Sequence, residues 1–126
     1  MSQSSPQVLL IINPISGVSG KEGLAEHTLS ALAHTGWGIE VAYTTCHGDA
    51  TRLAKDAVRR GFHAVLAAGG DGTVNETAAA LCHSRTRLGI IPCGSGNGLA
   101  RHLGIPIDID DALTIIGRGR HLVCDY

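Results

Sequence analysis

Two short runs of consecutive apolar residues constrain the fold of this chain more than any other feature. They occupy residues 8–12 and 64–68, and neither alternates with polar residues. An uninterrupted apolar run with β-branched content is typical of a strand buried on both faces, as in a parallel sheet. Because aromatic residues make up only 3% of the 126 residues, the core that covers these strands must be aliphatic and tightly packed.

Helical patterns alternate with strand patterns along the chain. Capping-box patterns and apolar residues at helical spacing predict helices at residues 19–35, 49–60, 73–83, 99–103 and 108–116. Further strands are predicted at residues 39–45, 88–91 and 121–125. Alternating strands and helices with short connections predict an α/β fold, a three-layer sandwich with a mainly parallel sheet.

The composition excludes several function classes. Ten basic and 11 acidic residues leave a formal charge of −1, so no nucleic acid is expected as a partner. The four cysteines lack the spacing of zinc ligands and indicate a reducing compartment. The first apolar stretch is too short for a signal peptide or a membrane span. We therefore expect a cytoplasmic protein whose association with a membrane is peripheral.

Three polar loops that are rich in glycine follow predicted strands, at residues 13–17, 69–75 and 92–97. Ligands of an open parallel sheet bind beyond the carboxyl ends of the strands, where these loops lie. Glycine lets main-chain N–H groups approach an anion, and each loop leads into a helix N-terminus that favours phosphate. The loops indicate a phosphate site, most simply for ATP. Walker A and dinucleotide patterns are incomplete, because Glu22 and Leu99 replace a required Ser/Thr and Gly.

Two acidic residues accompany the second glycine loop. Asp71 lies in its middle, where a carboxylate would repel phosphate unless it meets magnesium or accepts a proton from an attacking hydroxyl. Both roles fit phosphoryl transfer. The alternative is an Asx turn, in which Asp71 bonds its own backbone. Glu76 either orders the active site or forms a capping box with Thr73.

The three loops resemble the catalytic-domain signature of diacylglycerol kinases, sphingosine kinases and bacterial lipid kinases. The matching stretches are residues 13–17, 69–76 and 92–101, and only the second is shared with NAD kinases and, more loosely, phosphofructokinases. The resemblance implies a domain like the N-terminal domain of NAD kinase and phosphofructokinase over residues 1–120. Residues 121–126 would then begin the crossover to a C-terminal β-sandwich domain that this sequence lacks.

The resemblance implies an ATP-dependent lipid kinase, a transferase acting in lipid metabolism and phospholipid biosynthesis. It would move the γ-phosphoryl group to a lipid hydroxyl such as that of diacylglycerol, and this fragment, inactive alone, would supply the ATP site. The implied partners are ATP, Mg²⁺ as cofactor, and a lipid alcohol at a membrane surface; a homodimer is also compatible. An NAD kinase-like phosphotransferase and a non-catalytic nucleotide-binding module are the alternatives.

The resemblance also implies roles for individual residues. Asp71 matches the proton acceptor of sphingosine kinases, whereas bacterial relatives place that role on a carboxylate of the second domain. No residue of this chain is assigned as a metal ligand, since the family places much of the magnesium site in the second domain. The residues expected to bind the nucleotide are Asn13, Ser16, Gly17, Thr44, Gly69, Gly70, Asp71, Gly72, Thr73, Asn75, Gly94, Ser95, Gly96 and Asn97.

Overall fold

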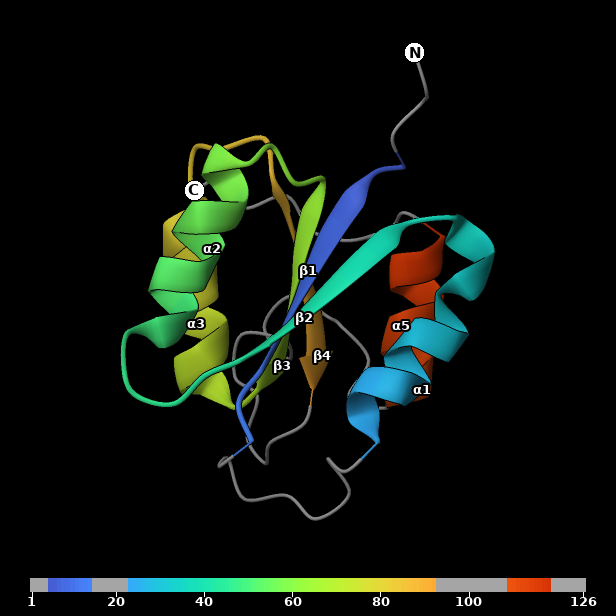
Figure 1. Ribbon diagram of the computed structural model, residues 1–126. Coiled ribbons are helices and arrows are strands. Elements are labelled where there is room, and N and C mark those ends of the chain that lie inside the picture. Colours follow the sequence, from blue (N-terminus) through green and yellow to red (C-terminus); the bar gives the residue numbers. More distant parts are fainter. Residues whose placement is uncertain (1–4, 15–22, 93–108, 119–126) are drawn as a thin grey trace.

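The computed structural model describes residues 5–14, 23–92 and 109–118. Within these ranges the strands are β1 (Gln7–Ile12), β2 (Gly38–Tyr43), β3 (Ala64–Gly69) and β4 (Arg87–Pro92). The helices are α1 (Leu24–Ala31), α2 (Asp49–Arg59), α3 (Asp71–Leu81) and α5 (Ile109–Gly117), and the short 3₁₀ helix η1 (Ala33–Thr35) follows α1 (Figure 1). No helix in this described part combines the length and apolar content that crossing a bilayer requires.

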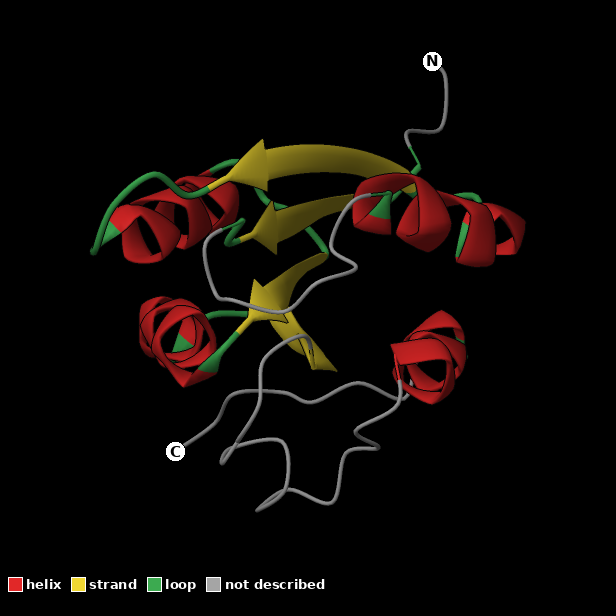
Figure 2. Ribbon diagram, turned by 90° about the horizontal axis from the view of Figure 1, so that it is seen from below, coloured by secondary structure: helices red, strands yellow, loops and turns green. Residues whose placement is uncertain are grey.

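The strands form one parallel sheet in the order β2-β1-β3-β4. Helices α2 and α3 cover one face of the sheet, and α1 and α5 cover the other (Figure 2). The predicted three-layer α/β fold with a parallel sheet is therefore confirmed. Because all four strands run the same way, their carboxyl ends lie at one edge, and the connections that follow them gather there.

Alternate residues of β1 enter two separate cores. Leu9 and Ile11 pack in the cluster beneath α2 and α3. Val8, Leu10 and Ile12 pack in the cluster beneath α1 and α5. All six residues of β3 are buried as well, as the continuous apolar runs predict. The two central strands thus provide a fixed base for the segments at their carboxyl ends.

Glycines set the ends of α2 where the sequence predicts them. Gly48 precedes the helix with φ of 93°, and Gly61 follows it with φ of 75°. Only glycine adopts this left-handed region without steric cost. The predicted helix at residues 19–35 is divided, because α1 ends at Ala31 and η1 follows. The predicted strand at residues 39–45 ends two residues early, at Tyr43.

The start of α3 differs from the prediction. The helix begins at Asp71 with Gly70 as its N-cap, so Thr73 lies within the first turn and does not cap the helix. The predicted capping box of Thr73 and Glu76 is therefore wrong. Since β3 continues to Gly69, most of the predicted glycine loop belongs to a strand or a helix. The predicted elements at residues 19–22, 99–103 and 121–125 lie outside the described residues.

A tight turn after α3 places histidine where glycine is favoured. The N–H of Ser84 donates to the carbonyl of Leu81 at 3.0 Å. Cys82 has φ of −55° and ψ of 135°, and His83 has φ of 65°. These angles match a type II turn, whose third residue is normally glycine because a side chain is strained there.

We expect His83→Gly to raise the free energy of unfolding by about 0.5–1 kcal/mol, since relief of left-handed strain outweighs the added freedom of the unfolded chain. Urea denaturation of the wild type and the variant checks this value. His83→Ala, which keeps the strain, should bring no gain. Equal stability of the wild type and the glycine variant would contradict the prediction.

Candidate functional site

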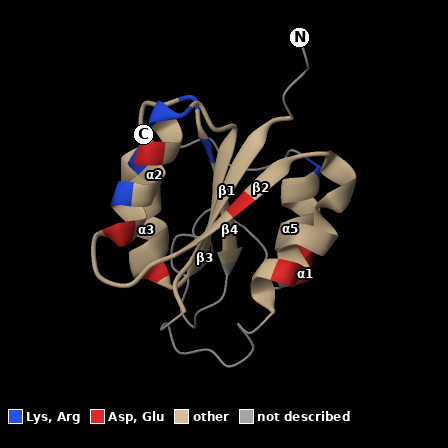
Figure 3. Ribbon diagram, viewed as in Figure 1, with Lys and Arg blue, Asp and Glu red and all other residues tan. Residues whose placement is uncertain are grey.

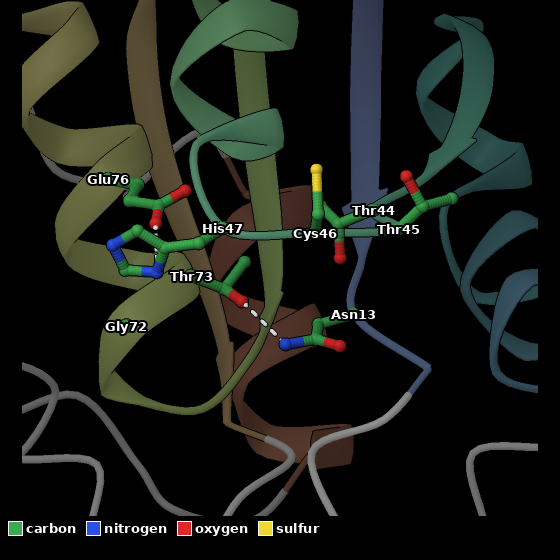
Figure 4. Close-up of a pocket in the computed structure, with 8 residues that line it drawn as sticks. All are labelled: Asn13, Thr44, Thr45, Cys46, His47, Gly72, Thr73 and Glu76. Carbon is green, nitrogen blue, oxygen red and sulfur yellow. Dashed lines mark hydrogen bonds and ion pairs between the residues drawn. The ribbon is translucent and has the colours of Figure 1, made fainter.

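A pocket of about 210 Å³ lies at the carboxyl edge of the sheet (Figure 4). Its described walls come from the ends of β1 and β2 and from the first turns of α3. The described residues that line it are Asn13, Thr44, Thr45, Cys46, His47, Gly72, Thr73 and Glu76. Segments that are far apart in the sequence therefore meet in one polar pocket, at the sheet edge where the sequence predicts a site.

Asn13 and Thr73 connect the first and second predicted loops. The side-chain amide of Asn13 donates to the hydroxyl of Thr73, with 3.2 Å between Nδ2 and Oγ1. The backbone N–H of Asn13 donates to the carbonyl of Ala68 at 3.0 Å. Thr73 itself is only 6% exposed. Two residues that the family resemblance associates with the nucleotide thus hold each other in place across the sheet edge.

Two glycines of the second loop have different surroundings. A Cβ at Gly69 would come within 2.9 Å of Oγ1 and 3.0 Å of Cβ of Thr73, and within 3.2 Å of Cβ of Asn13. Gly69 is thus required for the close approach of these two side chains. A Cβ at Gly72 would meet nothing within 4 Å. Because Gly72 lines the pocket, its missing side chain leaves open space there.

The first turn of α3 lies at this edge of the sheet. Its N-cap, Gly70, makes no side-chain capping bond. The first N–H groups of a helix have no partner within the helix and attract anions. The first turns of α2 and α3 also carry the acids Asp49 and Asp71. Figure 3 colours all described Asp and Glu residues red. Among the described residues, no three His, Cys, Asp or Glu side chains are grouped so as to hold a metal ion.

The connection between β2 and α2 forms the second wall of the pocket. The N–H of Thr44 continues the sheet by donating to the carbonyl of Ile12 at 3.0 Å. One carboxylate oxygen of Asp49 accepts the hydroxyl and the N–H of Thr45, each at 2.7 Å, and the N–H of Cys46 at 3.2 Å. These contacts fold the connection around the start of α2.

The environment of Asp49 keeps it ionised. The Thr45 hydroxyl, then the Thr45 N–H and the Arg52 guanidinium, hold the pKa of Asp49 well below its usual range. A lowered pKa in the folded state means that the contribution of Asp49 to stability is present above the ordinary aspartate pKa of about 3.9 and is lost as the pH falls below it. The connection therefore stays anchored at neutral pH.

Glu76 reaches from α3 to the end of the same connection. Both of its carboxylate oxygens accept the N–H of Gly48, at 3.2 Å each. Nδ1 of His47 lies 3.3 Å from Oε2 of Glu76 (Figure 4). Because the Glu76 carboxylate bonds Gly48, it does not reach back to the start of its own helix, which begins before Thr73 in any case.

The structure brings four of the predicted nucleotide residues to the pocket, namely Asn13, Thr44, Gly72 and Thr73. The others within the described residues are not among its described lining residues; they are Gly69, Gly70, Asp71 and Asn75. Six predicted residues lie outside the described residues; they are Ser16, Gly17, Gly94, Ser95, Gly96 and Asn97.

Three further lining residues were missed by sequence reasoning. Thr45, Cys46 and His47 belong to the β2–α2 connection, which is short of glycine and so did not fit a search for glycine-rich loops. A usable signal exists, because this connection also follows a strand of a parallel sheet and precedes a helix. The position of a connection therefore predicts the pocket wall better than its glycine content does.

Comparison with known proteins identifies relatives over nearly the whole chain. The profile of the family described as "Diacylglycerol kinase catalytic domain" matches residues 7–126. A "Probable lipid kinase YegS-like" of Pectobacterium atrosepticum is 39% identical over 127 residues, which cover 98% of this chain and 42% of the relative. A "Diacylglycerol kinase" of Bacillus subtilis is 45% identical over 100 residues, covering 77% of this chain and 33% of the relative.

A solved structure shows the same fold. The crystal structure of a putative diacylglycerol kinase from Bacillus anthracis superposes with a TM-score of 0.79 at 30% identity. The superposition covers 94% of this chain and 41% of that protein. The matched part of the chain thus spans between about one-third and two-fifths of the length of these relatives.

Proposed function

This chain belongs to the diacylglycerol kinase catalytic domain family, and from that premise we propose that it forms the ATP-binding part of a lipid kinase. The complete enzyme would transfer the γ-phosphoryl group of ATP to a hydroxyl group of a lipid such as diacylglycerol. The observation that carries this proposal is the pocket at the carboxyl edge of the sheet, where Gly72 leaves open space beside the first turn of α3.

The helix N-terminus, the polar side chains and the small volume of the pocket all suit phosphate groups. The N-terminus of α3 offers N–H donors and the positive end of the helix dipole. The paired side chains of Asn13 and Thr73 present polar atoms from two segments, and Thr44 adds a third. The volume of about 210 Å³ is below the roughly 300–1,000 Å³ of pockets that enclose a whole small ligand. The described residues thus suit the phosphates better than the entire nucleotide.

Phosphoryl transfer depends mainly on positioning and on neutralising charge. ATP bound with Mg²⁺ supplies the phosphoryl group and a metal charge that offsets the repulsion between oxygens. Asp71, exposed at the first position of α3, is the residue to which we assign the hydroxyl proton of the lipid. The lipid oxygen bonds to the γ-phosphorus as the bond to ADP breaks, while the carboxylate takes the proton.

The acceptor would be presented by a membrane. A lipid alcohol stays in the bilayer, so the enzyme would work from the cytoplasm as a peripheral protein. This part of the proposal predicts that the rate depends on the amount of membrane surface as well as on the lipid content of that surface.

The test is a kinase assay on the protein expressed from its complete reading frame. Vesicles containing diacylglycerol or a sphingoid base are incubated with radiolabelled ATP and Mg²⁺, and a parallel reaction contains NAD. We expect label in the organic extract of the vesicle reactions. Label in NAD alone would support the NAD kinase-like alternative, and label in neither product would contradict the proposal.

We expect Gly72→Ala to weaken ATP binding by about tenfold or more, because a methyl group would fill space next to the phosphates. The same variant should be as stable as the wild type or more stable by about 0.5 kcal/mol, since alanine is the better helix former and its Cβ meets no protein atom. Calorimetric titration with ATP and urea denaturation measure the two effects. Unchanged ATP affinity in a folded variant would contradict the placement of the phosphates.

A further inference from the structure

The carboxylate of Glu76 joins two elements that form different walls of the pocket. It projects from α3 and accepts the N–H of Gly48 with both oxygens at 3.2 Å. Gly48 is the N-cap of α2 and directly follows the pocket residues Thr44 to His47. The contact thus fastens the last residue of the β2–α2 connection to the helix across from it.

Other contacts near Glu76 do not perform the same task. The hydroxyl of Thr51 donates to the main-chain carbonyl of Glu76 at 3.3 Å, which joins α2 to α3 without the Glu76 side chain. The imidazole of His47 also lies beside Glu76, but it is 96% exposed, whereas the Glu76 side chain is 19% exposed. A contact made by a fully solvated side chain adds little restraint. The bond between the Glu76 carboxylate and the N–H of Gly48 therefore ties the end of the β2–α2 connection to α3, in addition to the apolar packing of α2 against α3.

Two carboxylates bind the β2–α2 connection from different helices. Asp49 binds Thr45 and Cys46, and so fixes the shape of the connection relative to its own helix, α2. Glu76 is on the neighbouring helix and fixes where that connection lies relative to α3. Without the Glu76 side chain the connection would keep its bonds to Asp49 and α2 would still pack on α3, but Gly48 would lose its hydrogen bond to α3.

We propose that Glu76 is a positioning residue that sets the width of the pocket by holding the β2–α2 connection against α3. The consequence for ATP rests on the proposed function, whereas the restraint itself follows from the hydrogen bonds. A wider pocket would contact the nucleotide less well, so the KM for ATP should rise. Since Glu76 acts through Gly48, kcat at saturating ATP should change little.

The experiment compares Glu76→Ala, Glu76→Gln and Thr51→Val in the complete protein. Amide hydrogen exchange without nucleotide should be roughly tenfold faster at Gly48 in Glu76→Ala, which lacks the acceptor. Glu76→Gln keeps one carbonyl acceptor and should stay within about twofold of the wild type. Thr51→Val removes a contact between the same helices and should leave exchange at Gly48 unchanged.

Measurements of KM for ATP and of kcat then show whether the restraint affects nucleotide binding. We expect the KM for ATP to rise about tenfold in Glu76→Ala and about twofold or less in Glu76→Gln, with kcat within about twofold in both. The penalty in Glu76→Ala should be equal for ATP and for 2′-deoxy-ATP. A penalty that vanishes with 2′-deoxy-ATP would mean that Glu76 binds the ribose directly, and it would overturn the proposal.

The two proposals fail in different ways. Unchanged exchange at Gly48 in folded Glu76→Ala would overturn the role of Glu76, whether or not the protein binds ATP. Faster exchange in a protein whose wild type binds no ATP would support the restraint and contradict the proposed function. Should Glu76→Ala not fold, Glu76→Met decides, because it keeps the length of the side chain but has no oxygen acceptor: roughly tenfold faster exchange at Gly48 supports the proposal, and an unchanged rate overturns it.

Discussion

Replacing Asp71 with asparagine should lower kcat by about 10³-fold in the complete protein, while the affinity for ATP stays within a few-fold of the wild type. Asparagine has nearly the same shape as aspartate, but it cannot accept the proton of the lipid hydroxyl. Asp71 begins α3 and is exposed, so the substitution should leave the packing of the domain intact. Single-turnover kinetics with labelled ATP, together with calorimetric titration, separate the chemical step from binding.

A matched control tests whether any acid at a helix start would behave in this way. Asp110 lies in the first turn of α5, is also exposed, and pairs with His27 at 2.6 Å. Asp110→Asn should leave kcat unchanged. If Asp71 serves only the helix dipole, both variants would lose no more than about 1 kcal/mol of stability and neither would lose activity. That result would assign the role of proton acceptor to a carboxylate outside the described residues.

Truncating Leu66 to alanine should lower the free energy of unfolding by about 3–4 kcal/mol. Leu66 is completely buried in β3, in the core beneath α1 and α5. Its removal leaves a cavity between a central strand and rigid neighbours, so the loss includes both the transfer of the side chain and the unfilled space. Urea denaturation measures the change. Leu29→Ala, at a side chain that is 39% exposed, should cost below about 1 kcal/mol.

Gly89, which pairs with Leu66 on the adjacent strand β4, provides a second test of this packing. A Cβ at Gly89 would lie 2.6 Å from Cδ2 of Leu66 and 3.3 Å from Cδ1 of Ile116. Gly89→Ala should therefore destabilise the wild type through overpacking, by about 1–3 kcal/mol. In the Leu66→Ala background the first clash is gone, so the same change should cost much less. Additive losses in the double variant would contradict this packing.

Much of the fold could be predicted from local sequence patterns. The apolar runs identified the buried strands because a strand covered on both faces tolerates no polar side chain, and β1 and β3 are such strands. Gly48 and Gly61 marked the limits of α2 because a left-handed backbone favours glycine. The start of α3 was misplaced because Thr73 and Glu76 match a capping box in sequence, although both bind partners distant in the chain.

The candidate site was predicted only in part, for a related reason. Glycine-rich loops pointed to Gly72 and Thr73, because sparse side chains leave the backbone accessible. The bond between Asn13 and Thr73 joins residues 60 positions apart, and no local pattern contains that information. For Glu76 the sequence left two roles open, and its bond to Gly48 depends on how α2 packs beside α3, which no local pattern contains.

The strand order β2-β1-β3-β4 has a consequence for synthesis on the ribosome. β1 emerges first, yet its two partners come from later parts of the chain, up to Gly69. In a nascent chain the apolar segment of β1 therefore lacks one of its partners, and is prone to aggregation, until β3 has left the exit tunnel. A product released before α3 by a premature stop would have no complete pocket and an open sheet edge, which is a template for aggregation.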